Sequence, residues 1–417
     1  MKSNTKNLPR PLEGYTIIDF TTALAGPYAT LLLAGLGARI IKVENPLAPD
    51  SARSNSPYIG REGVTTVRSH ADDMSLAMAE RGRNKLSITL NMKHRQARKI
   101  FADLVGQADA VVENYSAGTA DRLGMGYAAA SAINRRIVYT SISGFGANNV
   151  SGQTKAMDTI VQALSGLMMT SGEPGDMPVR VGVPFGDLSA PLFAVIGTLA
   201  ALMQAKNTGE GQHVDVSLLG ALTSMLACEP FEAMERAGNE IRTGRFMPRL
   251  APFGIFSTKD GYISICAPKE SFSGALFREM GVPDLIKDER FSTRDGRVKH
   301  NKELHAMVEA WTSTVSTSEA VERLEKAGVP SGAVRKPAEG VRDPRLLERG
   351  ETELIEHPKY GRVDTLYGGG MPILMSGAFT GFDRPAPTLG EHNDFVYGEL
   401  LGYSAEELSA LKQDGAI

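Results

Sequence analysis

An alternation of strand-like and helix-like segments in the N-terminal part of the chain constrains its fold more than any other feature. Strands are predicted at Tyr15–Phe20, Ala38–Glu44, Leu86–Leu90, Ala110–Glu113 and within Ile137–Gly146, with helices at Tyr28–Gly35 and Arg95–Gln107. Such an alternation is typical of a parallel sheet that is covered by helices on both faces. We therefore expect an α/β fold built around a doubly wound sheet.

Two closely spaced glycines, Gly35 and Gly37, invite comparison with a dinucleotide-binding loop. They end a predicted helix, whereas the phosphate-binding glycines of that loop must begin one. The third glycine of the motif is replaced by Ile40. The sequence therefore gives no reason to expect NAD.

The rhythm of strands and helices is lost after residue 227, which predicts three segments: 1–227, 228–340 and 341–417. The middle segment is interpreted as a separate small α+β domain. It contains a hairpin at Gly254–Cys266 that turns at Asp260-Gly261, followed by helices at 272–280, 302–313 and 318–327, the last of them capped by Ser318. Residues 46–72 are predicted to form a long surface or active-site loop, and the C-terminal helix to be capped by Ser404.

Composition narrows the classes of function. The formal net charge of −3 over 417 residues does not favour nucleic acid as a partner. Cys228 and Cys266 both lie in apolar runs, which predicts buried thiols in a reducing compartment. Met1–Asn7 has no apolar segment of signal-peptide length, and no uninterrupted apolar stretch of about 18 residues occurs. We expect a cytoplasmic protein that acts without a membrane partner.

The usual signals of several enzyme classes are missing. The sequence contains no Gly-x-Ser-x-Gly, Walker loop, His-Glu-x-x-His or Cys-x-x-Cys motif. None of its seven histidines is paired with another at helical spacing. Serine hydrolysis, nucleotide hydrolysis and a bound metal are therefore not predicted.

One carboxylate, Asp187, stands where a strand, a glycine turn and a helix are predicted to meet. Val179, Val181 and Val183 alternate before it, and Ser189 is a candidate N-cap after it. The helix that follows, up to Ala205, has so many apolar residues that we expect it to be buried. The dipole of that helix should keep Asp187 ionised. Two interpretations stay open on pattern alone: an ordinary acid near a helix start, or a carboxylate nucleophile toward a thioester or similar acyl group.

Polar side chains also follow the predicted strands at the ends where ligands gather in open α/β sheets. Asn114 and Tyr115 follow one strand, with Arg122 a short distance behind them, and Ser143–Gly146 end another. They are candidates to line a pocket, and turn formation is an equally good explanation for them.

These stretches, taken in order, resemble the class III CoA-transferases, a family that includes formyl-CoA:oxalate and carnitine CoA-transferases. The resemblance runs from Leu12 to Ile417. It is carried by Pro11–Phe20, Ala25–Pro27, Leu36–Glu44, Arg83–Lys85, Leu90–Lys93, Val112–Tyr115, Asp121–Gly124, Ser141–Gly146, Thr208–Asp215, Gly328–Gly332 and Gly390–His392. Each motif is weak alone, but the ordered set is specific.

The resemblance implies that Asp187 is the catalytic nucleophile and that coenzyme A, as a substrate thioester, is the cofactor. It implies that Lys93 and Arg122 lie near the nucleotide. Ala23, Leu24, Ala25, Met92, Asn114 and Tyr115 would line the path of the pantetheine and adenine. The sequence departs from its relatives at Asn45, where some have an arginine, and at Leu24, where formyl-CoA transferase has a glutamine. Neither the affinity for CoA nor the preferred acyl group follows from the resemblance.

The resemblance further implies a Rossmann-like, CoA-binding large domain built from both chain ends, a small inserted domain, and a homodimer of interlocked rings. The expected activity moves CoA from an acyl-CoA, with succinyl-CoA as a candidate donor, to a free carboxylic acid. A 2-methylacyl-CoA racemase is an alternative, although Met157 fills the position of the histidine base of those enzymes. A non-catalytic CoA-binding subunit is a third possibility.

Overall fold

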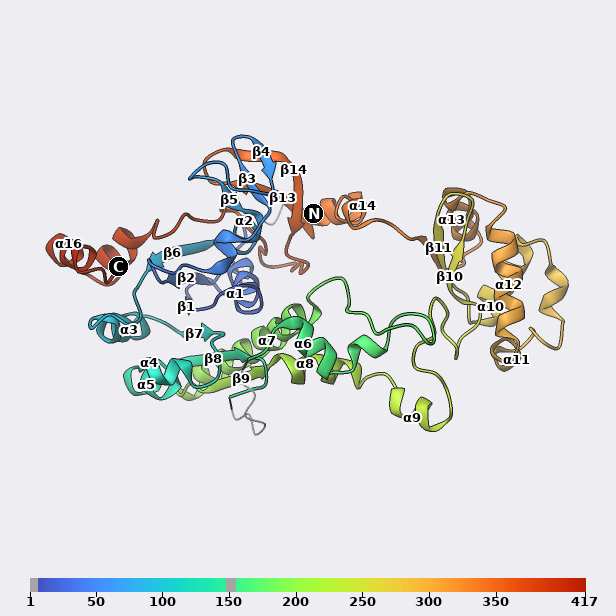
Figure 1. Ribbon diagram of the computed structural model, residues 1–417, viewed down its shortest axis with the longest axis horizontal. Helices are drawn as coiled ribbons and strands as arrows, with labels where there is room; N and C mark the ends of the chain where they lie inside the picture. Colours follow the sequence, from blue (N-terminus) through green and yellow to red (C-terminus); the bar gives the residue numbers. More distant parts are fainter. Residues whose placement is uncertain (1–6, 148–154) are drawn as a thin grey trace. The chain divides into compact units, whose positions relative to one another are not determined.

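The computed structural model describes residues 7–147 and 155–417 (Figure 1), so the expectation for Met1–Asn7 falls almost entirely outside the described residues. The chain forms two compact units. Unit 1 comprises the residues up to Ser165, Gly182–Cys228 and Val341–Ile417, and unit 2 comprises Gly166–Val181 and Glu229–Gly340. Residues 166–181, which the sequence analysis assigned to the large domain, make their contacts with unit 2.

Unit 1 is built on a six-stranded parallel sheet. Its strands are β1 (Thr16–Asp19), β2 (Arg39–Glu44), β6 (Lys85–Thr89), β7 (Ala110–Glu113), β8 (Val138–Ser143) and β9 (His213–Ser217), in the order β6-β2-β1-β7-β8-β9. This is the doubly wound order, in which the direction of strand addition reverses between β1 and β7. The predicted α/β fold with a parallel sheet is confirmed.

Helices of unit 1 cover the sheet and connect its strands. They are α1 (Ala25–Gly35), α2 (Leu76–Arg81), α3 (Ala97–Gly106), α4 (Thr119–Leu123), α5 (Tyr127–Ile133), α6 (Asp158–Leu164), α7 (Phe185–Thr208), α8 (Leu218–Leu226), α15 (Pro344–Arg349) and α16 (Ala405–Gln413). One buried cluster joins apolar residues of β1, β2, β6 and β7 to residues of α3 and to Val396, Tyr397 and Ile417. The two ends of the chain therefore share one hydrophobic core.

The C-terminal segment is tied to β6 by hydrogen bonds as well as by apolar packing. Tyr397 Oη donates to the Thr89 carbonyl at 2.7 Å, and Thr89 N donates to Asn393 Oδ1 at 2.9 Å. The predicted Ser404 cap is present as a capping box with Glu407. The final helix is thereby fixed beside the carboxyl end of an edge strand.

Residues 46–72 are more ordered than the loop expected from sequence. Within them lie the 3-10 helix η2 (Ser51–Ser54) and two strands, β3 (Tyr58–Gly60) and β4 (Gly63–Thr65). These strands join β5 (Met74–Ser75) in a small antiparallel sheet, and β4 contacts β14 (Gly361–Gly369) of the hairpin that β14 makes with β13 (Thr352–His357). Strands of two or three residues are too short to show a period in the sequence.

Unit 2 is a small α+β body with its own core. Its antiparallel sheet contains β10 (Phe253–Ser257), β11 (Tyr262–Cys266) and β12 (Ser331–Ala333), and its helices are α9 (Phe231–Arg236), α10 (Glu270–Glu279), α11 (Arg294–Lys299), α12 (Asn301–Thr312), α13 (Thr317–Lys326) and α14 (Pro337–Gly340). The predicted hairpin is confirmed. Helix α13 begins one residue earlier than predicted, and Ser316, not Ser318, caps it.

Two burial predictions are wrong. Cys228 is exposed, as are most residues from Thr223 to Pro230, and Cys266, at the end of β11, is only partly buried. Helix α7 is buried along one side, but Leu192, Phe193, Ile196 and Met203 are exposed. Among the described helices α7 alone has the length and hydropathy of a membrane span, with 50% of that window buried. A core helix of a soluble protein has the same properties, so this is weak evidence for a membrane.

Candidate active site at the first turn of helix α7

The strand order of unit 1 creates a crevice between the carboxyl ends of β1 and β7, where ligands bind in open α/β folds. The loop after β1 and the loop after β7 meet there. Thr22 N donates to Asn114 Oδ1 at 2.8 Å, and Asn114 Nδ2 donates to the Thr22 carbonyl at 2.9 Å. The amide of Asn114 thus pairs with the backbone of Thr22 as a neighbouring strand would, and it fixes the loop after β1.

Two buried charged residues, Lys42 and Asp50, hold the loop after β1. Asp50 Oδ1 accepts from Ala23 N at 2.8 Å, and Asp50 Oδ2 forms an ion pair with Lys42 Nζ at 2.8 Å. Lys42 also donates to the Thr21 carbonyl at 2.8 Å. Burial alone would raise the pKa of Asp50, but Lys42 and two backbone N–H groups outweigh it and lower that pKa.

This support explains an unusual backbone conformation at Ala23, which has a φ of +64°. A residue with a side chain adopts this region only when its surroundings compensate for the strain. The next turn is equally constrained, since a Cβ at Gly26 would lie 2.4 Å from Thr21 Cβ. The loop therefore presents its backbone to the crevice in one defined shape.

Helices α1 and α7 pack against each other, and both begin at the carboxyl edge of the sheet. Asp187 lies in the first turn of α7, so it shares this edge with Leu24 and Ala25 at the start of α1. The predicted start of the helix is wrong: α7 begins at Phe185, directly after Pro184, and Ser189 is inside it. Val179, Val181 and Val183 do not form a strand.

A second carboxylate, that of Asp158 at the start of α6, supports the first turn of α7. Asp158 Oδ1 accepts from Gly186 N at 2.8 Å and from Asp187 N at 3.4 Å, and Asp158 Oδ2 accepts from Gln162 Nε2 at 2.7 Å. It therefore caps α7 from outside the helix. Asp158 directly follows Met157 and was not among the residues predicted to form the site.

The electrostatic environment of Asp187 differs from the one expected from the helix dipole. Burial and the nearby Asp158 raise the pKa of Asp187 to about 6, and Arg81 partly opposes them. The prediction that the helix end alone would keep this carboxylate ionised is therefore wrong below pH 6. At neutral pH most of it is ionised but poorly hydrated, which is the state of a reactive carboxylate nucleophile.

The remaining residues predicted to bind CoA occupy the same edge of the sheet. Met92 and Lys93 follow β6, and Asn114 and Tyr115 follow β7. Met92 and Tyr115 pack on one core cluster, while Lys93 is exposed. Arg122, on α4, is exposed and donates to Thr119 Oγ1 at 2.7 Å. In the part of the chain that is described, neither Lys93 nor Arg122 forms an ion pair, so both cations are available to phosphate.

Comparison with known proteins decides the family. The sequence model of CoA-transferase family III matches residues 12–393. The chain belongs to CoA-transferase family III. It is 31% identical to human succinyl-CoA:glutarate CoA-transferase over 100% of this chain and 92% of the relative. It is 36% identical to acetyl-CoA:oxalate CoA-transferase of Acetobacter aceti over 97% of this chain and 100% of the relative.

Solved structures agree with this assignment. A CAIB/BAIF family protein from Brucella suis superposes with a TM-score of 0.80 at 31% identity, covering 94% of this chain and 100% of that chain. A hypothetical protein from Mycobacterium tuberculosis superposes with a TM-score of 0.79 at 26% identity, covering 94% and 99%. The molecule is thus an enzyme of CoA-transferase family III, and its fold matches these solved structures.

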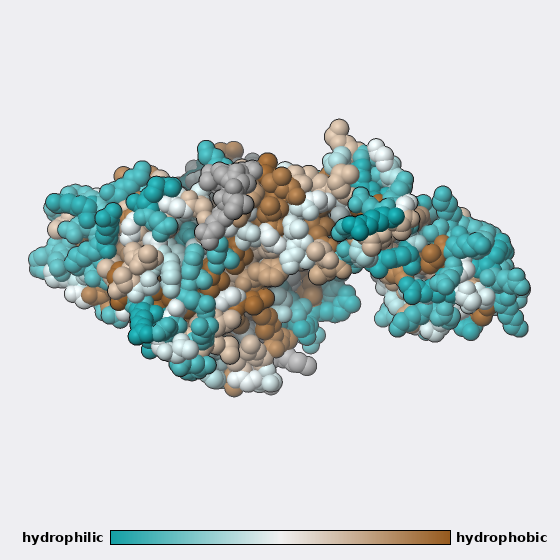
Figure 2. All heavy atoms as spheres, turned by 90° about the horizontal axis from the view of Figure 1, so that it is seen from below, coloured by the Kyte–Doolittle hydropathy of each residue, from teal (hydrophilic) through white to brown (hydrophobic). Residues whose placement is uncertain are grey.

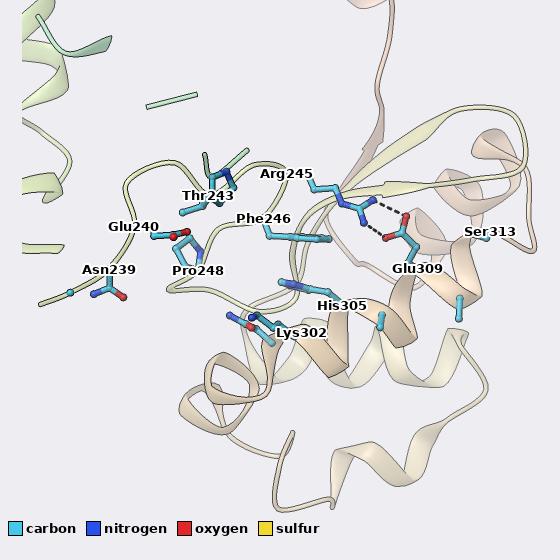
Figure 3. Close-up of a pocket in the computed structure, with 15 residues that line it drawn as sticks. Asn239, Glu240, Thr243, Arg245, Phe246, Pro248, Lys302, His305, Glu309 and Ser313 are labelled. Atoms are coloured by element: carbon cyan, nitrogen blue, oxygen red, sulfur yellow. Dashed lines mark hydrogen bonds and ion pairs between the residues drawn. The ribbon is translucent and has the colours of Figure 1, made fainter. Parts of the chain in front are cut away.

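This CoA-transferase has a further cavity, of 730 Å³, within unit 2 (Figure 3). Figure 3 shows the rings of Phe246 and His305 stacked along it and the two hydrogen-bonded arms of the Arg245–Glu309 pair. Burial lowers the pKa of His305 to about 4, with Arg245 contributing, so this ring is neutral. None of the residues predicted for CoA or catalysis lines the cavity, and its arginine is already paired. The cavity is therefore separate from the residues predicted to act in catalysis and CoA binding.

Proposed function

We propose that this enzyme transfers CoA from an acyl-CoA to a free carboxylic acid, with Asp187 as the nucleophile. The observation that carries the proposal is the poorly hydrated carboxylate in the first turn of α7, a helix that packs against α1 and begins, like α1, at the carboxyl edge of the sheet. Family membership supports the reaction class, and the position of Asp187 supports the residue.

The reaction proceeds through exchanges that conserve acyl activation. The Asp187 carboxylate attacks the thioester carbonyl of the donor, which forms an aspartyl anhydride and releases CoA thiolate. The thiolate attacks the aspartyl carbonyl, which forms an aspartyl-CoA thioester and releases the donor acid. The acceptor carboxylate then attacks the aspartyl-CoA thioester, which forms a second anhydride and releases CoA thiolate. The thiolate attacks the acceptor carbonyl of that anhydride, which releases the acceptor as its CoA thioester and regenerates the Asp187 carboxylate. Each step exchanges one activated carbonyl for another, so the enzyme needs positioning more than a strong base.

The oxyanions of these steps require hydrogen-bond donors that no other group occupies. No side chain caps α1 at Leu24, so the backbone N–H groups of Ala25 and Gly26 are available at its positive end. The fixed loop at Thr21–Leu24 keeps them in place. We assign the oxyanion site to this helix start.

The CoA molecule itself would run along the carboxyl edge of the sheet. In the proposal, Ala23, Leu24, Ala25, Met92, Asn114 and Tyr115 line the path of the pantetheine and adenine, while Lys93 and Arg122 bind the phosphates. Relatives named for succinyl-CoA with glutarate, D-citramalate or mesaconate make succinyl-CoA the candidate donor.

The racemase alternative requires two bases that exchange a proton at the 2-carbon. Met157, which precedes the Asp158 that caps α7, is 77% exposed and cannot accept a proton. The alternative therefore lacks one base at the position where the racemases have it. CoA transfer needs only Asp187.

Incubation with succinyl-CoA and a panel of carboxylic acids tests the function. Transfer predicts a new acyl-CoA whose appearance depends on the added acid. It also predicts a CoA adduct on the peptide that contains Asp187, detected by mass analysis after quenching. A racemase would instead epimerise a 2-methylacyl-CoA with no free acid present, and a non-catalytic subunit would bind CoA without turnover.

Replacing Asp158 with asparagine should shift the acidic limb of the pH–rate profile to lower pH. The amide keeps an oxygen that accepts from Gly186 N but removes the like charge that raises the pKa of Asp187. Because the pKa of Asp187 is raised to about 6, we expect the limb near pH 6 in the parent and a shift of up to about one pH unit in the variant. The measurement is kcat/KM from pH 4.5 to 8. Glu210→Gln, just beyond the C-terminal end of α7, is the matched control. If the acidic limb of Asp158→Asn stays at the parental pH or moves to higher pH, the argument is contradicted.

We also propose that the enzyme is a homodimer. Figure 2 shows hydrophobic residues gathered over the part of unit 1 that contains α6, α7 and α8. Exposed members of this apolar face are Ile160 and Leu164 on α6 and Leu192, Phe193, Ile196 and Met203 on α7. Leu192, Ile196 and Met203 recur at helical spacing, so they form one stripe along α7. A contiguous exposed apolar face of this kind is typical of a subunit interface.

A charge in that stripe should break the dimer. Ile196→Glu is expected to shift the mass in solution, measured by light scattering after gel filtration, toward that of a monomer, because a buried unpaired carboxylate is costly. Arg61→Glu makes the same change toward negative charge at an exposed turn between β3 and β4, outside the stripe, and should leave the dimer intact. A parent enzyme that is monomeric at micromolar concentration would refute the proposal.

A further inference from the structure

Arg81, the last residue of α2, is a partly buried arginine for which the described residues provide no hydrogen-bond or ion-pair partner. Its Nε is enclosed and has no hydrogen-bond partner. Within residues 7–147 and 155–417, no carboxylate forms an ion pair with its guanidinium, and the adjacent Glu80 accepts a hydrogen bond from Gly369 N at 3.0 Å. Buried polar groups in folded proteins are almost always hydrogen-bonded, and charged ones cost the most when they are not. An unsatisfied guanidinium therefore indicates a group that binds there.

The position of Arg81 connects it to the candidate active site. Helix α2 packs against η2, which follows Asp50 directly, and against α1, which in turn packs against α7. The guanidinium is within electrostatic range of both Asp50 and Asp187. Asp50 is occupied by Lys42 and by the backbone of Ala23. Arg81 therefore belongs to a helix that packs on η2 and α1, and it interacts electrostatically with Asp187 without forming an ion pair with either carboxylate.

The chemistry of the guanidinium limits what it can bind. Its planar fork matches a carboxylate or a phosphate, to which it donates two parallel hydrogen bonds. The proposed function already places the phosphates of CoA at Lys93 and Arg122, which leaves a carboxylate for Arg81. In the proposed reaction, the reacting carboxyl of each acid must be at Asp187, where it is joined first to aspartate and then to CoA. A monocarboxylic acid has no other acidic group to offer. Only an acid with a second carboxylate can satisfy Arg81 while its first carboxylate reacts.

We infer that Arg81 is a specificity-determining residue that holds the remote carboxylate of a dicarboxylic acid during CoA transfer. The inference rests on the proposed function and names the substrate class of the same site. Because donor and acceptor acids occupy the site in turn, Arg81 acts on both when both are dicarboxylic. No bond to Arg81 is made or broken, so the atom balance of the reaction is unchanged.

The test compares acceptors of equal length that differ by one carboxylate. With acetyl-CoA as donor, which has no second carboxylate, we would measure kcat/KM for glutarate and valerate and for succinate and butyrate. The assays are run at pH 8, well above the pKa of Asp187 near 6, so that a change in that pKa on substitution of Arg81 does not alter the measured rates. The parent enzyme should prefer each dicarboxylate over its partner by on the order of 100-fold.

Two substitutions of Arg81 and a control separate specificity from folding. Arg81→Gln should reduce the dicarboxylate preference to within about threefold, and Arg81→Lys should reduce it to an intermediate value, since lysine keeps the charge but not the fork. Arg61→Gln removes the same charge from an exposed position and should keep the parental preference. Should Arg81→Gln fail to fold, as seen by thermal unfolding, Arg81→Lys carries the test.

Two results would overturn the inference while the proposed function stands: a parent that uses monocarboxylates as well as dicarboxylates, or an Arg81→Gln variant that loses activity toward both to the same extent. If no acyl-CoA and acid exchange CoA in the parent, the proposed function itself fails. The two failures are thereby distinguishable.

Discussion

Asp187→Asn should lower the rate of CoA transfer by about 10⁴-fold or more, because an amide cannot form the anhydride with the donor acyl group. The structure gives this substitution a favourable context: asparagine has nearly the same volume, and Asp158 can still accept hydrogen bonds from Gly186 N and from the backbone of residue 187. The measurement is the initial rate of acyl-CoA formation, with mass analysis to show that no adduct appears on residue 187.

Amide hydrolysis could restore the aspartate, so a second variant is needed as a control. Asp187→Ala cannot revert, and it should be as inactive as freshly prepared Asp187→Asn. Binding of CoA, measured by calorimetry, should be kept in both variants, since the proposed contacts of the nucleotide lie at Lys93 and Arg122. Parental turnover by Asp187→Ala would end the proposal that this residue is the nucleophile.

Asp187→Asn should also stabilise the folded protein at neutral pH. The pKa of Asp187 is raised from 3.8 to about 6, so the folded state holds the proton more tightly than the unfolded state. The parent therefore loses stability as the pH rises from about 4 to about 6, and its ionised carboxylate costs about 1–3 kcal/mol at pH 7.5 once partial solvation is included. Asp187→Asn should unfold at a higher temperature than the parent at pH 7.5, and the difference should vanish near pH 4.

The second large effect is expected at the buried charges under the loop after β1. Lys42→Met should lower the free energy of unfolding by about 3–5 kcal/mol, because it leaves the carboxylate of Asp50 buried without its cation. Both side chains of this pair are 1% exposed, so water cannot replace the lost partner. Urea unfolding followed by circular dichroism measures the change.

A double variant shows whether the charge or the packing causes the loss. Lys42→Met/Asp50→Asn removes both charges but keeps an oxygen that can accept from Ala23 N, so it should recover most of the stability. The amide oxygen would also hold the backbone of Ala23 in place. We therefore expect CoA transfer to be faster in the double variant than in Lys42→Met. A double variant as unstable as the single one would show that packing around the lysine stem dominates.

Some elements were predictable because their signals are local. The strands β1, β2 and β7 are short runs of Val and Ile, and the Ser404 capping box and the Asp260-Gly261 turn depend on residues within four positions of each other. The parallel sheet followed from their alternation with helices. The family followed from an ordered set of short motifs, none of which is specific alone.

Other features involve partners that are far apart in the sequence, and the sequence analysis missed them. The start of α7 was misplaced because its cap is the carboxylate of Asp158, 28 residues before Gly186, rather than a neighbouring serine. The burial of α7 was overestimated because composition alone does not show which apolar residues face the core. The strands between residues 46 and 72 are too short to produce a pattern.

The sequence by itself determined the α/β class and the family and led to the proposal of Asp187 as nucleophile, because these depend on periodicity and on residue identity at motif positions. Only the tertiary structure decided the electrostatic state of that residue. The pKa of about 6 arises from the burial of Asp187 and from Asp158, opposed by Arg81, and these three residues come from separate segments of the chain. Electrostatic energies depend on distance and on exclusion of water, which are defined only once the chain has folded.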